Sequence, residues 1–182
     1  MSTKRQEKSS AQKSEKLDEK NAKLAERAEK LVLGEITPAQ FLGLSKQRLY
    51  ELAGKGHEMF KSGQIRGALD IFEGLVAASP YDSVFHCHLA ATYARLERFD
   101  EAKASYTRSL ELNVGNVDAL VGRGELYLRE RKLSQALKDI QQALKLDPQA
   151  TRDTTKRARA TLLVLQKMAE AGEGPAPKPG KR

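Results

Sequence analysis

Apolar residues between positions 49 and 150 recur every three or four residues, which is the spacing of an amphipathic helix. The whole pattern repeats every 34 residues, without insertion, in the blocks 49–82, 83–116 and 117–150. A turn-prone or charged break divides each block near its middle. Small residues stand at the eighth and twentieth positions of every block: Gly56, Ala90 and Gly124, and Ala68, Ala102 and Ala136. The pattern therefore predicts three helical hairpins whose helices approach closely at these small residues.

Large side chains stand at the eleventh and twenty-fourth positions of the blocks: Met59, Tyr93 and Tyr127, and Phe72, Tyr106 and Ile140. Stacked hairpins of this kind bury one continuous core. The three blocks resemble tetratricopeptide repeats, and the resemblance covers residues 49–150. It implies an all-α fold, a superhelical solenoid of three helix-turn-helix repeats.

The segments that flank the repeats differ from them in composition. Residues 1–36 are charged and helix-prone, and we expect a solvated, partly frayed helical extension there. Its leucines are spaced by seven, a weak coiled-coil signal, at Leu17, Leu24 and Leu31. A Thr-Pro pair predicts a short packing helix over residues 37–48. Residues 151–172 are amphipathic and predict a capping helix with one basic face, and residues 173–182 predict a disordered basic tail.

The net charge of +8 is unevenly distributed along the chain. Residues 1–48 contain 11 basic and 7 acidic residues, residues 49–150 contain 13 and 14, and residues 151–182 contain 8 and 3. Contact with nucleic acid or a membrane surface is therefore expected to be a non-specific property of the ends. The sequence shows neither a secretory signal nor a long apolar stretch, so we expect a cytoplasmic protein without a membrane span.

Residues with catalytic or metal-binding chemistry are few. The tripeptide His86-Cys87-His88 holds two of the three histidines and the only cysteine. Residues i and i+2 of a helix point about 200° apart, so these two histidines cannot share a metal ion. Phosphate-binding loops and hydrolase or zinc-protease motifs are absent from the sequence. We therefore expect no enzymatic activity, no cofactor and no metal site.

The inner wall of a solenoid of hairpins is formed by the first helix of each repeat, which is where binding is expected. Positions two, five, nine, twelve and thirteen of each repeat should face this groove. They are Tyr50, Ala53, His57, Phe60, Lys61, Val84, Cys87, Ala91, Ala94, Arg95, Asp118, Val121, Glu125, Leu128 and Arg129. Small and apolar residues dominate, with one cation per repeat at position thirteen. Such a groove suits an extended peptide segment with apolar anchors.

One well-known ligand of such repeats, the acidic C-terminal peptide of Hsp70 or Hsp90, is not expected here. Repeats that hold those peptides use a Lys/Asn/Arg clamp on the carboxylates. The clamp positions in this sequence are occupied by Ala53, His57, His88, Asp118 and Gly122. No cationic pair is available to form the charge-assisted hydrogen bonds that a terminal carboxylate requires.

Residues 71–93 and 99–106 carry a narrower resemblance, to the class II translocator chaperones of bacterial type III secretion. The matching residues are Phe72, Leu75, Tyr81, Asp82 and Leu89 to Ala91. The resemblance implies a small cytoplasmic chaperone that holds an apolar segment of a secreted protein and dimerises through its N-terminal region. Two alternatives stay open: a scaffold that joins two proteins of another complex, and an RNA- or ribosome-associated adaptor that uses its basic tails.

Overall fold

The computed structural model describes residues 3–170 as backbone, and the side chains of residues 16–167. This part of the chain forms nine helices and no strand, and the predicted disordered tail 173–182 lies outside it. The helices are α1 (Thr3–Val32), α2 (Pro38–Phe41), α3 (Lys46–Lys61), α4 (Ile65–Ala78), α5 (Ser83–Arg95), α6 (Phe99–Leu112), α7 (Val117–Arg129), α8 (Leu133–Leu146) and α9 (Asp153–Glu170). Within the described range, none of them is long and apolar enough to cross a membrane.

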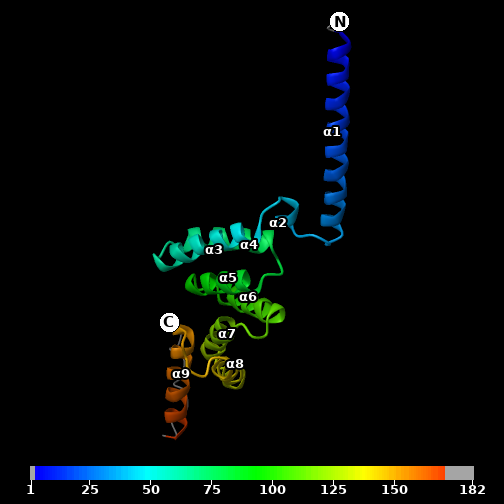
Figure 1. The fold of residues 1–182 in the computed structure, drawn as a ribbon. Helices are drawn as coiled ribbons and strands as arrows, with labels where there is room; N and C mark the ends of the chain where they lie inside the picture. Colours follow the sequence, from blue (N-terminus) through cyan, green and yellow to red (C-terminus); the bar gives the residue numbers. More distant parts are fainter. Residues whose placement is uncertain (1–2, 171–182) are drawn as a thin grey trace, which may run out of the picture.

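Helices α3 to α8 form three hairpins, α3/α4, α5/α6 and α7/α8, which stack one on the next along the array (Figure 1). The alanines at position twenty, Ala68, Ala102 and Ala136, are completely buried. At position eight, a Cβ atom added to Gly56 would lie 2.9 Å from the ring of Phe72. Only small residues allow this separation between helices. The predicted all-α repeat solenoid is confirmed.

The hairpin turns share one backbone feature. Position fifteen of each repeat has a positive φ, +84° at Gly63, +59° at Glu97 and +63° at Arg131. This left-handed conformation ends the first helix of each hairpin, and only the first repeat uses the glycine that adopts it without strain.

The segment before the repeats differs from the expected single helix over residues 37–48. Helix α2 covers only Pro38–Phe41, and Gly43 then adopts a φ of +72°. The Ser45 side chain accepts a hydrogen bond from the backbone N–H of Arg48 and so starts α3 three residues before the first repeat block. The prediction of one packing helix was wrong because a left-handed glycine and a second N-cap divide the segment.

Helix α1 projects away from the array and packs only against α2 within the described chain (Figure 1). The guanidinium of Arg27 donates hydrogen bonds to the carbonyl oxygens of Gln40, at 2.8 Å, and Phe41, and lies over the Phe41 ring. Arg27 thus joins α1 to the end of α2. Leu17 and Leu24 remain more than half exposed.

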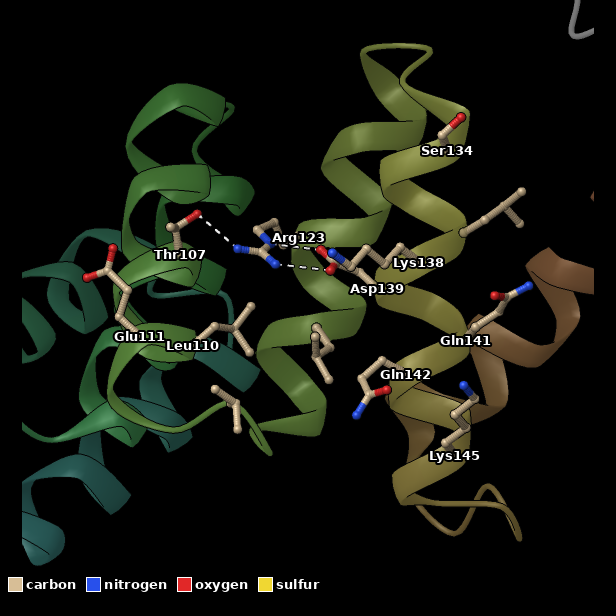
Figure 2. A pocket seen from close by; sticks show the side chains of 13 residues that line it. Thr107, Leu110, Glu111, Arg123, Ser134, Lys138, Asp139, Gln141, Gln142 and Lys145 are labelled. Atoms are coloured by element: carbon tan, nitrogen blue, oxygen red, sulfur yellow. Dashed lines mark hydrogen bonds and ion pairs between the residues drawn. The ribbon is translucent and has the colours of Figure 1, made fainter.

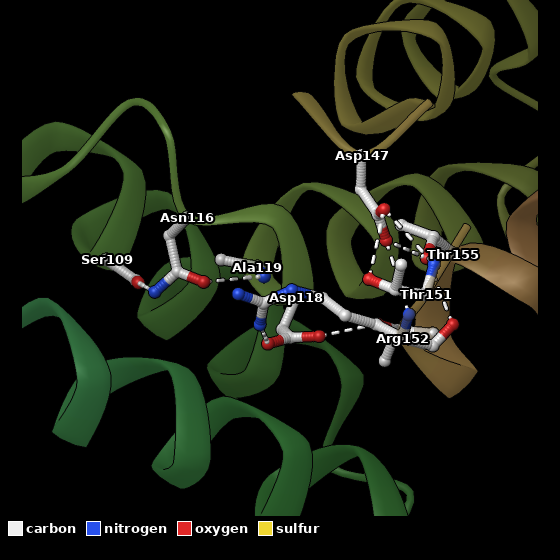
Figure 3. A network of polar contacts seen from close by, with 9 residues as sticks. Ser109, Asn116, Asp118, Ala119, Asp147, Thr151, Arg152 and Thr155 are labelled. Atoms are coloured by element: carbon white, nitrogen blue, oxygen red, sulfur yellow. Dashed lines mark hydrogen bonds and ion pairs between the residues drawn. The ribbon is translucent and has the colours of Figure 1, made fainter. Parts of the chain in front are cut away.

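Helix α9 packs against α7 and α8 and is held by a buried carboxylate. Asp147 accepts hydrogen bonds from the backbone N–H of Thr151 (3.1 Å) and Arg152 (3.3 Å) and from the hydroxyl of Thr155 (2.6 Å) (Figure 3). These hydrogen bonds lower the pKa of Asp147 to about 2, and the one from the Thr155 hydroxyl has the largest effect. The carboxylate caps the start of α9.

The register of the repeats continues into α9. Ala158 is 1% exposed and stands 34 residues after Gly124, at the position that holds a small residue in each repeat. Helix α9 therefore occupies the place of the first helix of a fourth repeat.

Candidate functional site

A cavity of about 600 Å³ opens along the first helices of the repeats, from α3 through α5 and α7 to α9. Seven of the residues expected to face the groove line it: His57, Phe60, Val84, Cys87, Ala91, Asp118 and Glu125. They come from all three repeats, so the cavity crosses the array instead of lying within one hairpin.

The other expected residues lie elsewhere. Ala53 and Val121 are 6% and 0% exposed and belong to the packing between helices. Ala94 and Leu128 pack against the same core with part of their surface exposed. Tyr50 donates a hydrogen bond to Asp82 at the start of α5. The three cations Lys61, Arg95 and Arg129 are exposed at the ends of their helices, outside the cavity.

Several residues on the cavity wall lie outside the five groove positions expected for each repeat, although two of them, His88 and Gly122, stand at clamp positions. His88 and Gly122 occupy position six of their repeats, one helical turn after position two, so the i, i+4 spacing could have identified them. Phe72 and Tyr106 reach the cavity from the second helices. A Cβ atom at Gly122 would lie 2.2 Å from the Tyr106 ring, so this glycine gives the ring its place in the wall.

Helix α9 supplies one side of the cavity. Arg152, the residue before α9, donates a hydrogen bond to Asp118 at 2.7 Å (Figure 3), and Thr154 donates another. Arg157 donates one to Glu125 at 3.4 Å. Both acids lie on α7, so the two helices neutralise each other's charge across the opening. The wall is therefore polar but electrically balanced.

The floor of the cavity is apolar and without a reactive group. Burial, and then the negative charge of Asp118, raise the pKa of the Cys87 thiol to about 12, so it stays protonated at neutral pH. Burial likewise raises the pKa of the Tyr106 hydroxyl. These groups contribute surface for packing and not a nucleophile.

Two of the histidines, His86 and His88, lie in different environments. His86 is buried and donates a hydrogen bond from Nε2 to the carbonyl oxygen of Pro80 at 2.9 Å. His88 faces the cavity, with its ring stacked on Phe72 at a centroid distance of 5.0 Å and in edge contact with His57. In the described range no cluster of three or more His, Cys, Asp or Glu residues is placed to hold a metal ion.

The contact between His88 and His57 predicts that the stability of the fold depends on pH. Burial, and then the positive charge of His57, lower the pKa of His88. The unfolded chain therefore binds a proton at higher pH than the folded chain, and stability falls as the pH drops below about 6.5, the unperturbed value. Urea denaturation at pH 7.5 and 5.5 should show a smaller loss of stability for His88→Gln than for the wild type. An equal loss in both proteins would contradict this assignment.

A second hollow, of about 800 Å³, lies between α6, α7 and α8 (Figure 2). Its wall is fixed by the largely buried ion pair of Arg123 and Asp139, in which Nε and Nη2 of the arginine donate to the carboxylate at 2.7 and 3.0 Å. Thr107 accepts a longer hydrogen bond from Arg123. This pair joins the two helices of the third hairpin, the hydrogen bond to Thr107 reaches the second repeat, and we assign the pair a structural role.

Comparisons with known proteins find similarity to tetratricopeptide repeats over part of the chain. A family model described as tetratricopeptide repeat matches residues 88–151. The human RNA polymerase II-associated protein 3 is 30% identical over 120 residues, which are 64% of this chain and 18% of that protein. The mouse sperm-associated antigen 1 is 30% identical over 116 residues, 62% of this chain and 13% of that protein. The chain thus spans less than a fifth of these relatives.

Two groups of solved structures share the fold. The type III secretion translocator chaperone SycD of Yersinia enterocolitica matches with a TM-score of 0.62 and 22% identity, over 71% of this chain and 98% of that one. The first repeat domain of Spaghetti (RPAP3), bound to the HSP90 peptide SRMEEVD, matches with a TM-score of 0.58 and 27% identity, over 71% and 97%. The first likeness shows the fold alone.

Proposed function

We propose that this chain, which carries tetratricopeptide repeats, is a non-enzymatic interaction module that holds an extended segment of a partner protein in the cavity along α3, α5, α7 and α9. The observation that carries the proposal is the composition of this cavity. Its floor of Phe60, Phe72, Cys87 and Ala91 is apolar, whereas the charges on its wall are paired. Such a site takes up apolar side chains and offers polar groups to the backbone beside them.

The repeat domain of RPAP3 supports a peptide ligand, because its solved structure contains one. The mode of binding should differ in this chain. Asp118 lies at one of the clamp positions, and its carboxylate already accepts hydrogen bonds from Arg152 and Thr154. Gly122 lies at another clamp position and is covered by the Tyr106 ring. We therefore propose an internal, apolar-anchored segment as the ligand and not a terminal carboxylate.

The finer role is a choice between two kinds of interaction protein. A secretion-type chaperone would shield one apolar segment of its client, in line with the fold shared with the translocator chaperone. A scaffold would join two proteins, in line with the sequence similarity to RNA polymerase II-associated protein 3. Binding to a client that is insoluble alone would support the first role, and simultaneous binding of two soluble proteins would support the second.

The long helix α1 offers a separate interaction surface. Its exposed leucines Leu17 and Leu24 suit a homodimer through the N-terminal region. A solved structure of the chaperone SycD is likewise described as a dimer. Binding of RNA through the basic ends would be non-specific and should disappear at about 0.2 M salt.

Ala91→Glu tests the groove directly. The full chain and the variant are screened against the same phage-displayed library of linear peptides. Ala91 lines the cavity without being fully buried, so glutamate should be tolerated in the free protein but desolvated beneath a bound peptide. We expect the variant to melt at the wild-type temperature and to lose peptides that the wild type selects.

Ala104→Glu is the matched control, because Ala104 is exposed on the second helix α6. It should select the same peptides as the wild type. If Ala91→Glu selects them as well, the binding site lies outside the cavity.

A further inference from the structure

Each first helix of the three repeats ends in a cation. Lys61 is the last residue of α3, Arg95 of α5 and Arg129 of α7, and all three are exposed. Helix α5 packs against both α3 and α7, so the three ends follow one another along one edge of the groove. We call Lys61, Arg95 and Arg129 the cation row.

A cation at a helix C-terminus also stabilises the helix dipole, and this is the alternative explanation. The second helices of the repeats indicate that the helix dipole is not the whole explanation. Helices α4 and α6 end without any basic residue in the last turn, although the same dipole acts there, and among the second helices of the repeats only α8 has one, Lys145. A cation thus ends every first helix of the three repeats, but lies in the last turn of only one of the three second helices.

Aromatic rings hold two of these cations in place. The guanidinium of Arg95 lies 5.9 Å from the centre of the Phe60 ring, next to Lys61 on α3. That of Arg129 lies 3.9 Å from the centre of the Phe99 ring. Contact with a ring face orients a guanidinium while leaving its N–H groups available at the edge.

No carboxylate neutralises the row within residues 16–167. None of the ion pairs in this range includes Lys61, Arg95 or Arg129. The carboxylate that follows Arg129 in the chain, that of Glu130, is held by Lys103 and Lys132. The row therefore contrasts with the ion pairs between α7 and the start of α9, where arginines and acids neutralise each other.

We propose that the cation row binds acidic side chains of the segment held in the groove and selects ligands in which they recur about every third residue. Neighbouring packed helices lie about 8–10 Å apart, and an extended chain advances about 3.3 Å per residue, so each repeat meets every third residue. The ligand is thus an extended protein segment with apolar anchors for the cavity and regularly spaced aspartate or glutamate. This inference rests on the proposed function, because it concerns the edge of the same groove.

The test uses fluorescence anisotropy with the full chain and a labelled nine-residue peptide. The probe has glutamate at its second, fifth and eighth residues and leucine or alanine elsewhere. One comparison peptide has glutamine at these three positions, and another has the three glutamates adjacent. We expect the regularly spaced glutamate probe to bind tightest. Each of Lys61→Ala, Arg95→Ala and Arg129→Ala should weaken it about fivefold, and the triple variant about a hundredfold.

Arg66→Ala, an exposed cation on the second helix α4, is the matched control and should leave the affinity unchanged. Equal affinity for the glutamine peptide, or unchanged binding by the triple variant, would overturn the role of the row while leaving groove binding intact. Unchanged binding of the glutamate probe by Ala91→Glu would instead reject the proposed function. The choice of a protein ligand would be overturned if the wild type bound a labelled oligouridylate more tightly than the glutamate probe and the triple variant did not bind this oligouridylate.

Discussion

Phe85→Ala should unfold the first two repeats more readily than any change on the groove surface. Phe85 is completely buried and belongs to the apolar cluster that joins the first hairpin to α5. Its ring centre lies 5.2 Å from that of Tyr50 on α3, so its loss leaves a cavity between repeats. We expect a cost of about 3–5 kcal/mol, or roughly 10 °C in melting temperature, in a thermal melt followed by circular dichroism.

Tyr81→Ala is the control for this truncation. Tyr81 is an aromatic residue of the same region, four residues before Phe85, but it is 63% exposed. Its removal should change the free energy of unfolding by less than about 0.5 kcal/mol. Equal shifts for the two variants would show that Phe85 does not join the repeats.

Ala102→Leu is the second change with a large expected effect on stability. It adds side-chain volume to the core, whereas Phe85→Ala removes it. Ala102 is completely buried at the close approach of α5 and α6. The added side chain must push the two helices apart or adopt a strained rotamer. Overpacking of this kind costs about 1–3 kcal/mol, and the repeat array passes the displacement to the neighbouring hairpins.

Ala104→Leu separates overpacking from a general effect of leucine. Ala104 lies on the same helix and is exposed, so leucine there should leave the melting temperature nearly unchanged. Should Ala102→Leu melt at the wild-type temperature, the close packing at position twenty would not be what holds the hairpins together.

The repeats could be predicted from the sequence because their packing leaves a local signature. A glycine or alanine at a helix contact is required by contact distance alone, and the 34-residue period shows that it is required three times. The division of residues 37–48 into two helical segments was harder to predict from the sequence. It depends on the left-handed turn at Gly43 and on the cap at Ser45, which compete with a helix-prone composition.

The candidate site was only partly predictable, for a geometric reason. Positions along one helix follow from its period, and seven of the lining residues on α3, α5 and α7 were found in this way. Phe72 and Tyr106 reach the cavity from other helices past small residues, which no single-helix pattern encodes. Arg152 and Arg157 were interpreted as the basic face of a cap, although Ala158 already carried the repeat register into α9.

The place of α9 in the register has a thermodynamic consequence. A terminal unit of a solenoid has a neighbour on one side only and opens more readily than the units within. Helix α9 is such a unit, yet it supplies Thr154 and Arg157 to the cavity wall, and Arg152 directly precedes it there. Any ligand that contacts these residues must add its binding free energy to the closing of this helix. Occupancy of the cavity and order of the last helix are thus linked equilibria, in which each raises the other by the same factor.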